Sequence, residues 1–350
     1  MNKDLFEFSY ENVWDALKRS ALPIVLYGMG NGADKVLDEF ERRGIKARGV
    51  MASEGFVRHQ HFRGFTVKSE RELLDELSDF TVALCFASSL PDVMDCIKGV
   101  SERHPLFVPN VPVYGDEIMD DRFLSKYKDQ IEEAYALLFD ERSRAVFKGV
   151  LDFVYTGRLP YLNRITSDKK EVFERILQLK DERYLDLGAY RGDTVEEFLK
   201  YSDGYEEILA AEPNEKNFRK LSEYAEQIDR ITLLHVGISD RKGTMLINTK
   251  GGRMASLSEK SGREVQVTAV DELPFSPTYI KADIEGFEHQ MLRGMQETLK
   301  RKPKLNIAAY HRTADFFTLI REIHAVNPAY RFYLRKHPYI PCWDLNLYAV

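Results

Sequence analysis

A short loop that combines glycine with carboxylates lies in the second half of the chain. In the segment "YLDLGAYRGDT", an apolar run typical of a buried strand leads into Gly188 and Gly192, and Asp186 and Asp193 flank these glycines. A dinucleotide loop needs glycine where Tyr190 stands, and it places a pyrophosphate on the helix that follows. The two carboxylates would repel a pyrophosphate. S-adenosylmethionine carries a cationic sulfonium and a cationic ammonium and no phosphate, so carboxylates attract it, and the loop favours this cofactor.

A further carboxylate ends the next strand-like run, "EILAAEPN". Glu212 follows Asp186 by 26 positions, and a carboxylate at the tip of the second strand of such a unit can accept hydrogen bonds from the ribose of an adenosine cofactor. The simpler alternative is that Glu212 and Asp193 only cap helices. The residues predicted to bind S-adenosyl-L-methionine are Asp186, Gly188, Ala189, Tyr190, Gly192, Asp193, Thr194, Glu212, Pro213, Asn214, Gly237 and Ser239.

Three residues near the ends of two later strand-like runs are candidates for catalysis. Asp283 and Glu285 lie in "KADIEGFEH", and His311 lies in "AAYHR". A hydroxyl acceptor must lose its proton during methyl transfer, so a base within hydrogen-bond reach assists the reaction. Asp283 is the first candidate for a residue in the reaction pocket, and His311 is the natural proton acceptor near neutral pH.

Each of these residues also has a structural interpretation. Asp283 or Glu285 can cap the helix that is predicted to follow, and a histidine at a strand end is often only a satisfied polar residue. An Asp/Glu/His cluster can also hold Mg²⁺, which would lower the pKa of the acceptor. The spacing does not demand a metal, and none is expected. Lys281 and His289 are interpreted as structural residues.

A second glycine loop, "YGMGNGA", lies far upstream. Gly28, Gly30 and Ala33 match the pattern of a Rossmann-like loop between a strand and a helix. The second strand of this region, "ARGVMA", carries no acid at its tip, and Glu54 comes only later. Without a ribose acceptor, the glycines are expected to form a tight turn in a domain that packs, dimerises or helps to bind the acceptor.

Two regions in which strand-like and helix-like segments alternate are separated by a helical stretch. A chain of 350 residues is too long for one typical core, and the alternation indicates parallel sheets with helices on their faces. We therefore predict an α/β protein with a smaller Rossmann-like domain at 1–110, a helical connector at 111–179 and a larger domain at 180–350. The last two strand-like runs, 331–337 and 345–350, are too close in sequence for a parallel crossover. They predict an antiparallel hairpin that ends a seven-stranded sheet, as in a class I methyltransferase.

The second half of the chain resembles the FkbM-type methyltransferase family. The segments "DLGAYRGDT", "AAEPNEKNF", "HVGISDRKGT", "VTAVDEL", "IKADIEGFEHQMLRGM" and "NIAAYH" occur in the order, and at about the spacing, found in that family, and they span roughly residues 184–350. The resemblance implies S-adenosylmethionine as cofactor and a hydroxyl of a sugar or a polyketide-like product as acceptor. Two positions depart from the family pattern. Tyr190 replaces a residue that is often smaller and polar, and Ala309–His311 lacks the acid that commonly precedes the histidine.

The overall composition narrows the choice of partners. The net charge is −6 and basic residues are dispersed, so nucleic acid is not expected as the main partner. No apolar run is long enough to span a bilayer, and residues 1–20 lack the apolar stretch of a signal peptide, so a cytoplasmic location is expected. We expect a small-molecule or glycan acceptor, with a nucleotide-linked sugar as one option. The loop 250–258 or the turn 155–164 could contact it, although a surface loop and a domain-packing turn are the favoured interpretations.

Three functions stay open at this stage. The leading hypothesis is an S-adenosylmethionine-dependent O-methyltransferase that modifies a sugar, a glycan or a related secondary metabolite. The second is a nucleotide-sugar oxidoreductase that uses the upstream glycine loop, and the third is a non-catalytic binding protein that keeps the methyltransferase shape. The sequence identifies neither the acceptor nor the oligomeric state, and a homo-oligomer formed through the N-terminal domain is compatible with it.

Overall fold

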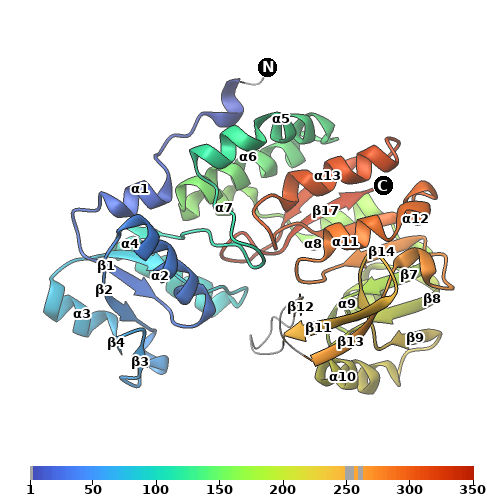
Figure 1. Cartoon of the computed structure of the whole chain (residues 1–350), viewed down its shortest axis with the longest axis horizontal. Coiled ribbons are helices and arrows are strands. Elements are labelled where there is room, and N and C mark those ends of the chain that lie inside the picture. The colour runs from blue at the N-terminus through green and yellow to red at the C-terminus, as the bar shows by residue number, and fades with distance from the viewer. Residues whose placement is uncertain (1–2, 249–255, 259–262) are drawn as a thin grey trace.

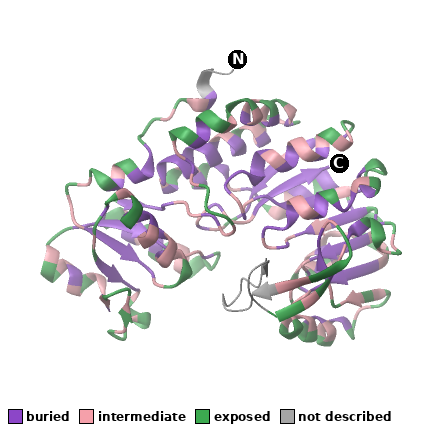
Figure 2. Cartoon of the chain, in the orientation of Figure 1, coloured by how far each residue is buried: buried purple, intermediate pink, exposed green. Residues whose placement is uncertain are grey.

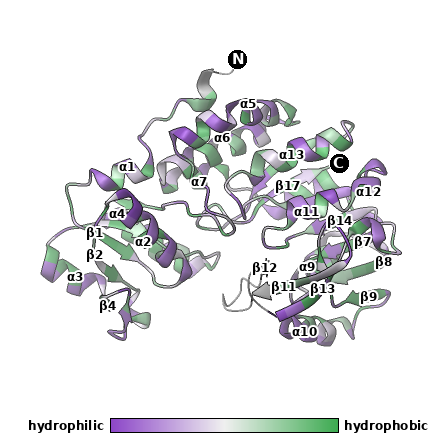
Figure 3. Cartoon of the chain, in the orientation of Figure 1, coloured by the Kyte–Doolittle hydropathy of each residue, from purple (hydrophilic) through white to green (hydrophobic). Residues whose placement is uncertain are grey.

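The computed structural model describes residues 3–248, 256–258 and 263–350. Two α/β units lie on either side of a set of helices, and the colours of Figure 1 run from the blue N-terminal unit through the green helices to the yellow and red C-terminal unit. Strands of both sheets are buried, while the outer faces of the helices are exposed (Figure 2). Hydropathy follows the same division, with apolar strands and polar outer helix faces (Figure 3). The predicted α/β fold class is confirmed.

The N-terminal unit contains a six-stranded sheet in the order β3-β4-β2-β1-β5-β6. Its strands are β1 (Ile24–Tyr27), β2 (Ala47–Met51), β3 (His61–Phe62), β4 (Phe65–Lys68), β5 (Thr81–Leu84) and β6 (Leu106–Phe107), and its helices are α1 (Val13–Lys18), α2 (Asn31–Arg43), α3 (Glu70–Leu77) and α4 (Pro91–Arg103), with 3₁₀ turns at Lys3–Phe6 and Glu54–Phe56. All neighbours pair in parallel except β3 and β4. Helix α2 ends where Gly44 takes a left-handed conformation (φ 67°), which glycine adopts without strain.

Helices of the middle region bridge the two sheets. They are α5 (Asp121–Leu137), α6 (Glu141–Thr156), α7 (Leu159–Ile165) and α8 (Lys169–Val172), which continues into a π-helical segment at Phe173–Leu177. Asp120 and Asp140 cap α5 and α6 by accepting backbone N–H groups, as short acidic side chains do at helix starts. Helix α6 is buried along most of its length and packs against β16 and α7.

The C-terminal unit contains a seven-stranded sheet in the order β16-β17-β15-β14-β7-β8-β9. Its strands are β7 (Lys180–Leu187), β8 (Asp203–Ala211), β9 (Ile231–Leu234), β14 (Tyr279–Ala282), β15 (Lys304–Ala308), β16 (Phe332–Lys336) and β17 (Leu345–Ala349), and its helices are α9 (Asp193–Tyr201), α10 (Glu215–Ala225), α11 (Glu288–Arg293), α12 (Gln296–Lys300) and α13 (Asp315–Val326), with a 3₁₀ turn at Val270–Glu272. Five strands are parallel, whereas β17 runs antiparallel between β15 and β16. The predicted terminal hairpin is therefore confirmed.

A small second sheet covers part of the C-terminal unit, with the order β10-β13-β11-β12. Its strands are β10 (Gly237–Ile238), β11 (Gly243–Asn248), β12 (Ser256–Ser258) and β13 (Arg263–Thr268). The apolar run 231–239 has the sequence pattern of a single strand. In the structure the chain leaves the main sheet after Leu234, and only Gly237–Ile238 pairs again, with β13. The two-residue strands β3 and β6 were not predicted, because segments this short show no alternation of side chains.

Direct contacts join the three parts. Ser88, after β5, exchanges two backbone hydrogen bonds with Ile340 of the C-terminal unit, 2.8 and 2.9 Å long. Asp140 at the start of α6 forms an ion pair with buried Arg335 of β16, with 2.6 Å between Oδ2 and Nη2. Aromatic rings continue the core across the junction, as where Phe147 of α6 meets Phe316 of α13. In the part of the chain that is described, no helix has the length and apolar character needed to cross a bilayer.

Candidate functional site

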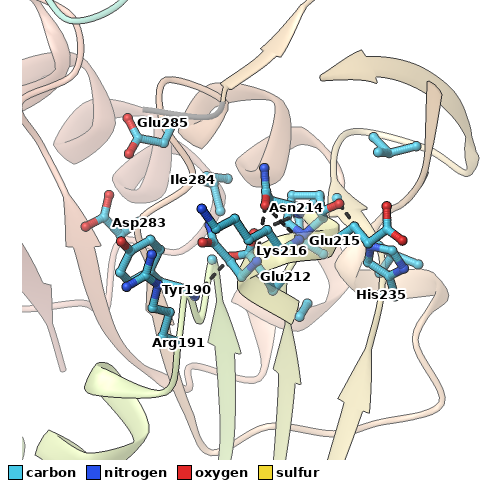
Figure 4. A pocket seen from close by; sticks show the side chains of 18 of the residues that line it. Tyr190, Arg191, Glu212, Asn214, Glu215, Lys216, His235, Asp283, Ile284 and Glu285 are labelled. Carbon is cyan, nitrogen blue, oxygen red and sulfur yellow. Dashed lines mark hydrogen bonds between the residues drawn. The ribbon is translucent and has the colours of Figure 1, made fainter. Parts of the chain in front are cut away.

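A cavity of about 1300 Å³ opens at the carboxyl ends of β7, β8 and β14. The carboxyl edge of a parallel sheet is where α/β folds bind ligands. Figure 4 shows Asp283 and Glu285 at one end of this cavity and His235 at the other, with Glu212 and Asn214 between them. Among the residues predicted from sequence, the cavity is lined by Gly188, Tyr190, Asp193, Thr194, Glu212, Pro213, Asn214, Gly237, Asp283 and Glu285. Asp186, Ala189, Gly192, Ser239 and His311 lie outside the lining that the described residues form.

The glycine loop is pressed between the ends of two neighbouring strands. Gly188 has a φ of 80°, and a Cβ atom there would lie 2.0 Å from the carbonyl oxygen of Asp283. Its N–H and that of Ala189 both donate to the carbonyl of Ala211 at the end of β8. Only glycine combines this conformation with so close an approach. The loop therefore holds the ends of β7, β8 and β14 in register around the cavity.

Asp186 lies beneath the loop and does not face the cavity. Strand β7 continues through Leu187, so Asp186 is still part of the sheet and is fully buried. Its Oδ2 accepts a hydrogen bond from Thr194, while Oδ1 has no hydrogen-bond partner among the described residues. Burial raises the pKa of Asp186 to about 6. Of the two acids predicted to border the cofactor, Asp193 lines the cavity and Asp186 does not, and their roles toward a cofactor stay predictions.

Glu212 stands at the tip of β8 and is almost completely buried. Its Oε2 accepts the N–H of Tyr190 at 3.0 Å and its Oε1 accepts the N–H of Asn214 at 2.8 Å. Burial raises the pKa of Glu212 to about 7. The cap of α10 is Asn214, which accepts two N–H groups of the first turn, and Asp193 starts α9 with no capping hydrogen bond within the described chain. The alternative that Glu212 and Asp193 are only helix caps is therefore wrong.

An acidic turn and a buried histidine form the other end of the site. Residues 283–287 connect β14 to α11, and Glu285 and Gly286 both have positive φ angles, 54° and 96°. The Nε2 atom of His311 lies 3.3 Å from Oδ1 of Asp283 and 3.6 Å from Oε2 of Glu285. Its Nδ1 lies 2.9 Å from Oε1 of Glu288. Three carboxylates, two from the turn after β14 and one from the start of α11, therefore meet around one imidazole.

The charges of this cluster bear on the role that the sequence suggested for His311. Burial opposes its charged form, but Glu288 and Asp283 hold the pKa of His311 well above its usual range. Burial likewise works against the charged form of Asp283, yet Lys281 and His311 keep the pKa of Asp283 low. Burial raises the pKa of Glu285 to about 7. In these surroundings the imidazole favours its charged form, so His311 can accept a proton only after it has lost the one it holds. Its catalytic role stays a prediction.

Comparison with known proteins identifies this region. Residues 186–340 match the family model of the methyltransferase FkbM domain. An FkbM methyltransferase domain therefore accounts for residues 186–340. The resemblance seen in the sequence is thereby confirmed.

One solved structure shares the fold along the whole chain, and others overlap parts of it with lower scores. The crystal structure of Methyltransferase FkbM from Methylobacillus flagellatus KT has a TM-score of 0.69 at 21% identity, with 100% of this chain and 96% of that chain covered. A precorrin-6y C5,15-methyltransferase from Geobacter metallireducens covers 53% of this chain and 90% of its own at 14% identity, with a TM-score of 0.32. Fibrillarin from Aeropyrum pernix, solved with S-adenosyl-L-methionine, covers 49% and 67% at 13% identity, with a TM-score of 0.33. No curated protein sequence matches the chain.

Three residues of the methyltransferase site were missed or interpreted differently from sequence. Lys281, which was interpreted as structural, lines the cavity, with its Nζ 4.0 Å from Oδ2 of Asp283. Tyr310 donates its hydroxyl to Asp283 at 3.2 Å. Glu288 is fully buried beside His311. An acid three positions after Glu285 and a tyrosine directly before His311 were visible in the sequence, but only the turn geometry brings them together.

The other segments considered for ligand binding lie elsewhere. Gly28 and Gly30 take φ angles of 108° and 118° in the turn between β1 and α2, as expected for a tight glycine turn. The turn 155–164 packs at the junction of the units, where the guanidinium of Arg158 lies 4.1 Å from the ring centre of Tyr10. Most of the loop 250–258, Arg253 included, lies outside the described residues.

Proposed function

We propose that the chain is an S-adenosylmethionine-dependent O-methyltransferase that methylates a hydroxyl of a sugar, a glycan or a related secondary metabolite. The observation that carries this proposal is one cavity that contains both the strand-tip carboxylate Glu212 and, at its other end, Asp283 and Glu285. These residues belong to an FkbM methyltransferase domain. The first carboxylate suits an adenosine ribose, and the pair suits a hydroxyl that must be deprotonated.

The residues at the Glu212 end fit S-adenosylmethionine. Each carboxylate oxygen of Glu212 accepts one backbone N–H and retains a lone pair for a ribose hydroxyl. The loop at Gly188 leaves no room for a side chain, so backbone can approach the ligand closely. Asp193 adds a carboxylate at the cavity wall, and it would attract a cationic ligand. When bound, the cofactor supplies an electrophilic methyl group.

The residues at the other end fit a hydroxyl acceptor. Asp283 and Glu285 line the cavity and are half-buried, so a substrate can reach them. Tyr310 and Lys281 hold Asp283 in place. These side chains would orient the acceptor hydroxyl for in-line attack, and positioning of this kind supplies a large part of the rate of a bimolecular reaction. The hydroxyl proton leaves toward this carboxylate pair as the new C–O bond forms.

The size of the cavity supports a second ligand beside the cofactor. Its volume of about 1300 Å³ exceeds the range of about 300–1,000 Å³ that is usual for a single small-molecule site. Arg191 and Lys216 add positive charge to its lining, whereas Arg263 is paired with Glu215. This charge suits an acceptor with hydroxyl and anionic groups. A nucleotide-linked sugar has both, and it is therefore the first acceptor class to test.

The cofactor assignment is tested by calorimetry with S-adenosylhomocysteine, the demethylated product of the cofactor, on the purified full chain. We expect binding by the wild type and loss of binding by Glu212→Ala. Lack of binding together with binding of NAD(H) would instead favour the oxidoreductase hypothesis. A screen with methyl-labelled cofactor against nucleotide sugars and glycans tests the acceptor, and label recovered on nitrogen or on protein would contradict O-methylation.

A further inference from the structure

The cluster at the acidic turn has the composition of a divalent metal site. Asp283, Glu285 and His311 each offer one ligand atom, and these atoms all lie within 4.8 Å of one another. Carboxylate oxygens combined with a single imidazole suit hard to borderline divalent cations such as Mg²⁺ and Mn²⁺. Two of the three side chains line the cavity, so a cation held here would be in contact with a bound substrate.

The distances between the ligand atoms suit one shared ion. With metal–ligand bonds of about 2.1 Å, neighbouring ligand atoms lie roughly 3.0–3.5 Å apart and opposite ones about 4.2 Å apart. The Nε2 atom of His311 lies 3.3 Å from Asp283 Oδ1 and 3.6 Å from Glu285 Oε2. These separations need only small movements of the carboxylates. The turn at Glu285, with its positive φ of 54°, directs a second carboxylate to the same point.

The imidazole of His311 supplies an independent observation. The side chain is 1% exposed, and neither ring nitrogen makes a hydrogen bond of acceptable geometry within the described residues. Buried polar groups in folded proteins nearly always have a partner, so a buried Nε2 that faces two carboxylates without bonding to them indicates a missing ligand. The distances from Nε2 of His311 to the carboxylates of Asp283 and Glu285 are those expected for three ligand atoms around one shared ion.

The opposite side of the same ring has the surroundings of a metal-bound histidine. Histidines that bind a metal through one nitrogen usually direct the other nitrogen at a carboxylate, which fixes the ring. Glu288 lies in this position. Its Oε1 is 2.9 Å from Nδ1 of His311, a close ion-pair contact whose angles fall outside those of a hydrogen bond. Glu288 is itself held by the turn, because it accepts the N–H groups of Ile284 and Gly286.

We propose that Asp283, Glu285 and His311 bind a divalent cation of the Mg²⁺ or Mn²⁺ class, with Glu288 as the positioning residue behind His311. This inference rests on the proposed methyl transfer to a hydroxyl for its chemistry. The cation has open positions toward the cavity, where the acceptor hydroxyl can coordinate. Coordination would make the hydroxyl more acidic. Its proton would then pass to water in the cavity and not to Asp283 and Glu285, which in this arrangement are ligands of the cation. The oxygen forms the C–O bond as the methyl–sulfur bond breaks, and the electron pair of that bond remains on sulfur.

An arrangement without a metal is also chemically consistent. His311 could carry a proton permanently and neutralise the surrounding carboxylates, together with Lys281. In that case the cluster would be a structural ion-pair network, and added cations would not bind there. The two arrangements therefore differ in a directly measurable quantity.

The test is a titration of the full chain with Mn²⁺ alone, followed by electron paramagnetic resonance, in which free Mn²⁺ gives the strong signal. We expect one bound ion per chain and at least about a tenfold higher Kd for Glu285→Gln. Glu288→Gln should weaken binding by roughly 10- to 100-fold. Asp240→Asn serves as the matched control, since this acid lies outside the cavity lining of the described residues, and it should bind as the wild type does. Circular dichroism verifies that each variant is folded.

The outcomes separate this inference from the methyltransferase proposal. Failure of the wild-type protein to bind Mn²⁺ at concentrations up to the millimolar range, while it binds S-adenosylhomocysteine, would overturn the metal site and leave the methyltransferase proposal standing. Binding of Mn²⁺ without binding of S-adenosylhomocysteine would do the reverse. Equal Mn²⁺ affinities of the wild type and Glu285→Gln would show that the ion binds elsewhere, which also overturns the assignment.

Discussion

Replacing Glu212 with glutamine should change two properties in opposite directions. Glu212 is 6% exposed, and burial raises its pKa from 4.5 to about 7. The folded protein therefore holds this proton more tightly than the unfolded chain does, so the free energy of unfolding falls as pH rises from about 4.5 to about 7. A shift of this size corresponds to roughly 3 kcal/mol. Glutamine does not titrate, so the variant should not show this part of the pH dependence.

The same substitution should weaken binding of the cofactor product. Glutamine replaces one carboxylate oxygen of Glu212 by an NH₂ group. This group would face a backbone N–H of Tyr190 or Asn214. It could also no longer accept a hydrogen bond from a ribose hydroxyl. Loss of one hydrogen bond to a charged group costs about 1.5–3 kcal/mol. The affinity for S-adenosylhomocysteine should therefore fall roughly 10- to 150-fold.

Urea unfolding near pH 5 and pH 8 measures the first effect, and calorimetry near pH 8 measures the second. Glu206→Gln is the matched control, since Glu206 lies on the same strand, β8, but is exposed. Relative to the wild type, Glu212→Gln should gain stability between the two pH values, and Glu206→Gln should not. An identical stability difference at both pH values would refute the raised pKa of Glu212. Unchanged affinity for S-adenosylhomocysteine would refute its role at the ribose.

Three further substitutions test how the site is built. Gly188→Ala should lower the free energy of unfolding by at least about 2 kcal/mol, because the added Cβ would meet the carbonyl of Asp283. Gly243→Ala is the control. No described atom lies within 4 Å of a Cβ at Gly243, so this variant should change stability little. Thr194→Val should lower the free energy of unfolding by about 1–3 kcal/mol, because it removes the hydrogen bond to buried Asp186. Thr194→Ser keeps the hydroxyl and should retain most of the stability. Equal losses in the two variants would argue against this bond. Asp140→Ala should lower stability by about 3–5 kcal/mol, since it leaves Arg335, which is 2% exposed, without its ion pair. Burial opposes ionisation of Asp140, but Arg335 and Ser143 hold its pKa below 3.8. The stabilisation should therefore be present above pH 3.8 and be lost as pH falls through the lowered pKa. Acid unfolding of the wild type and the variant would measure this loss.

The position of the site could be predicted because strand ends are visible in a sequence. Glu212 and Asp283 each follow an apolar run, and the carboxyl ends of parallel strands meet at one edge of a sheet. The order of these runs therefore predicts that Glu212, Asp283 and Glu285 lie at the same edge of the sheet, where all three line one cavity. The antiparallel ending of the sheet followed from the short connection between β16 and β17.

The orientation of individual side chains could not be predicted in the same way. Whether Asp186 faces the cavity depends on where β7 ends, and a strand two residues shorter would place it in the loop. The pKa of His311 depends on Glu288, which approaches only because the chain turns sharply at Glu285 and Gly286. Effects of this kind arise from tertiary contacts between residues whose spacing in sequence shows no pattern.

The acidic turn depends on both halves of the chain. A Cβ atom on Gly286 would lie 2.7 Å from the side chain of Tyr114, and the N–H of Tyr114 donates to the carbonyl of His311. Arg312 connects the turn to Tyr114. Its guanidinium donates a hydrogen bond to the carbonyl of Gly286 at 2.9 Å and lies 4.2 Å from the ring centre of Tyr114. A segment that precedes the helical region therefore forms the back of the turn that carries Asp283 and Glu285. The N-terminal half of the chain thus helps to shape the end of the cavity that contains Asp283 and Glu285. This holds whether or not the glycine loop at Gly28 and Gly30 binds a ligand.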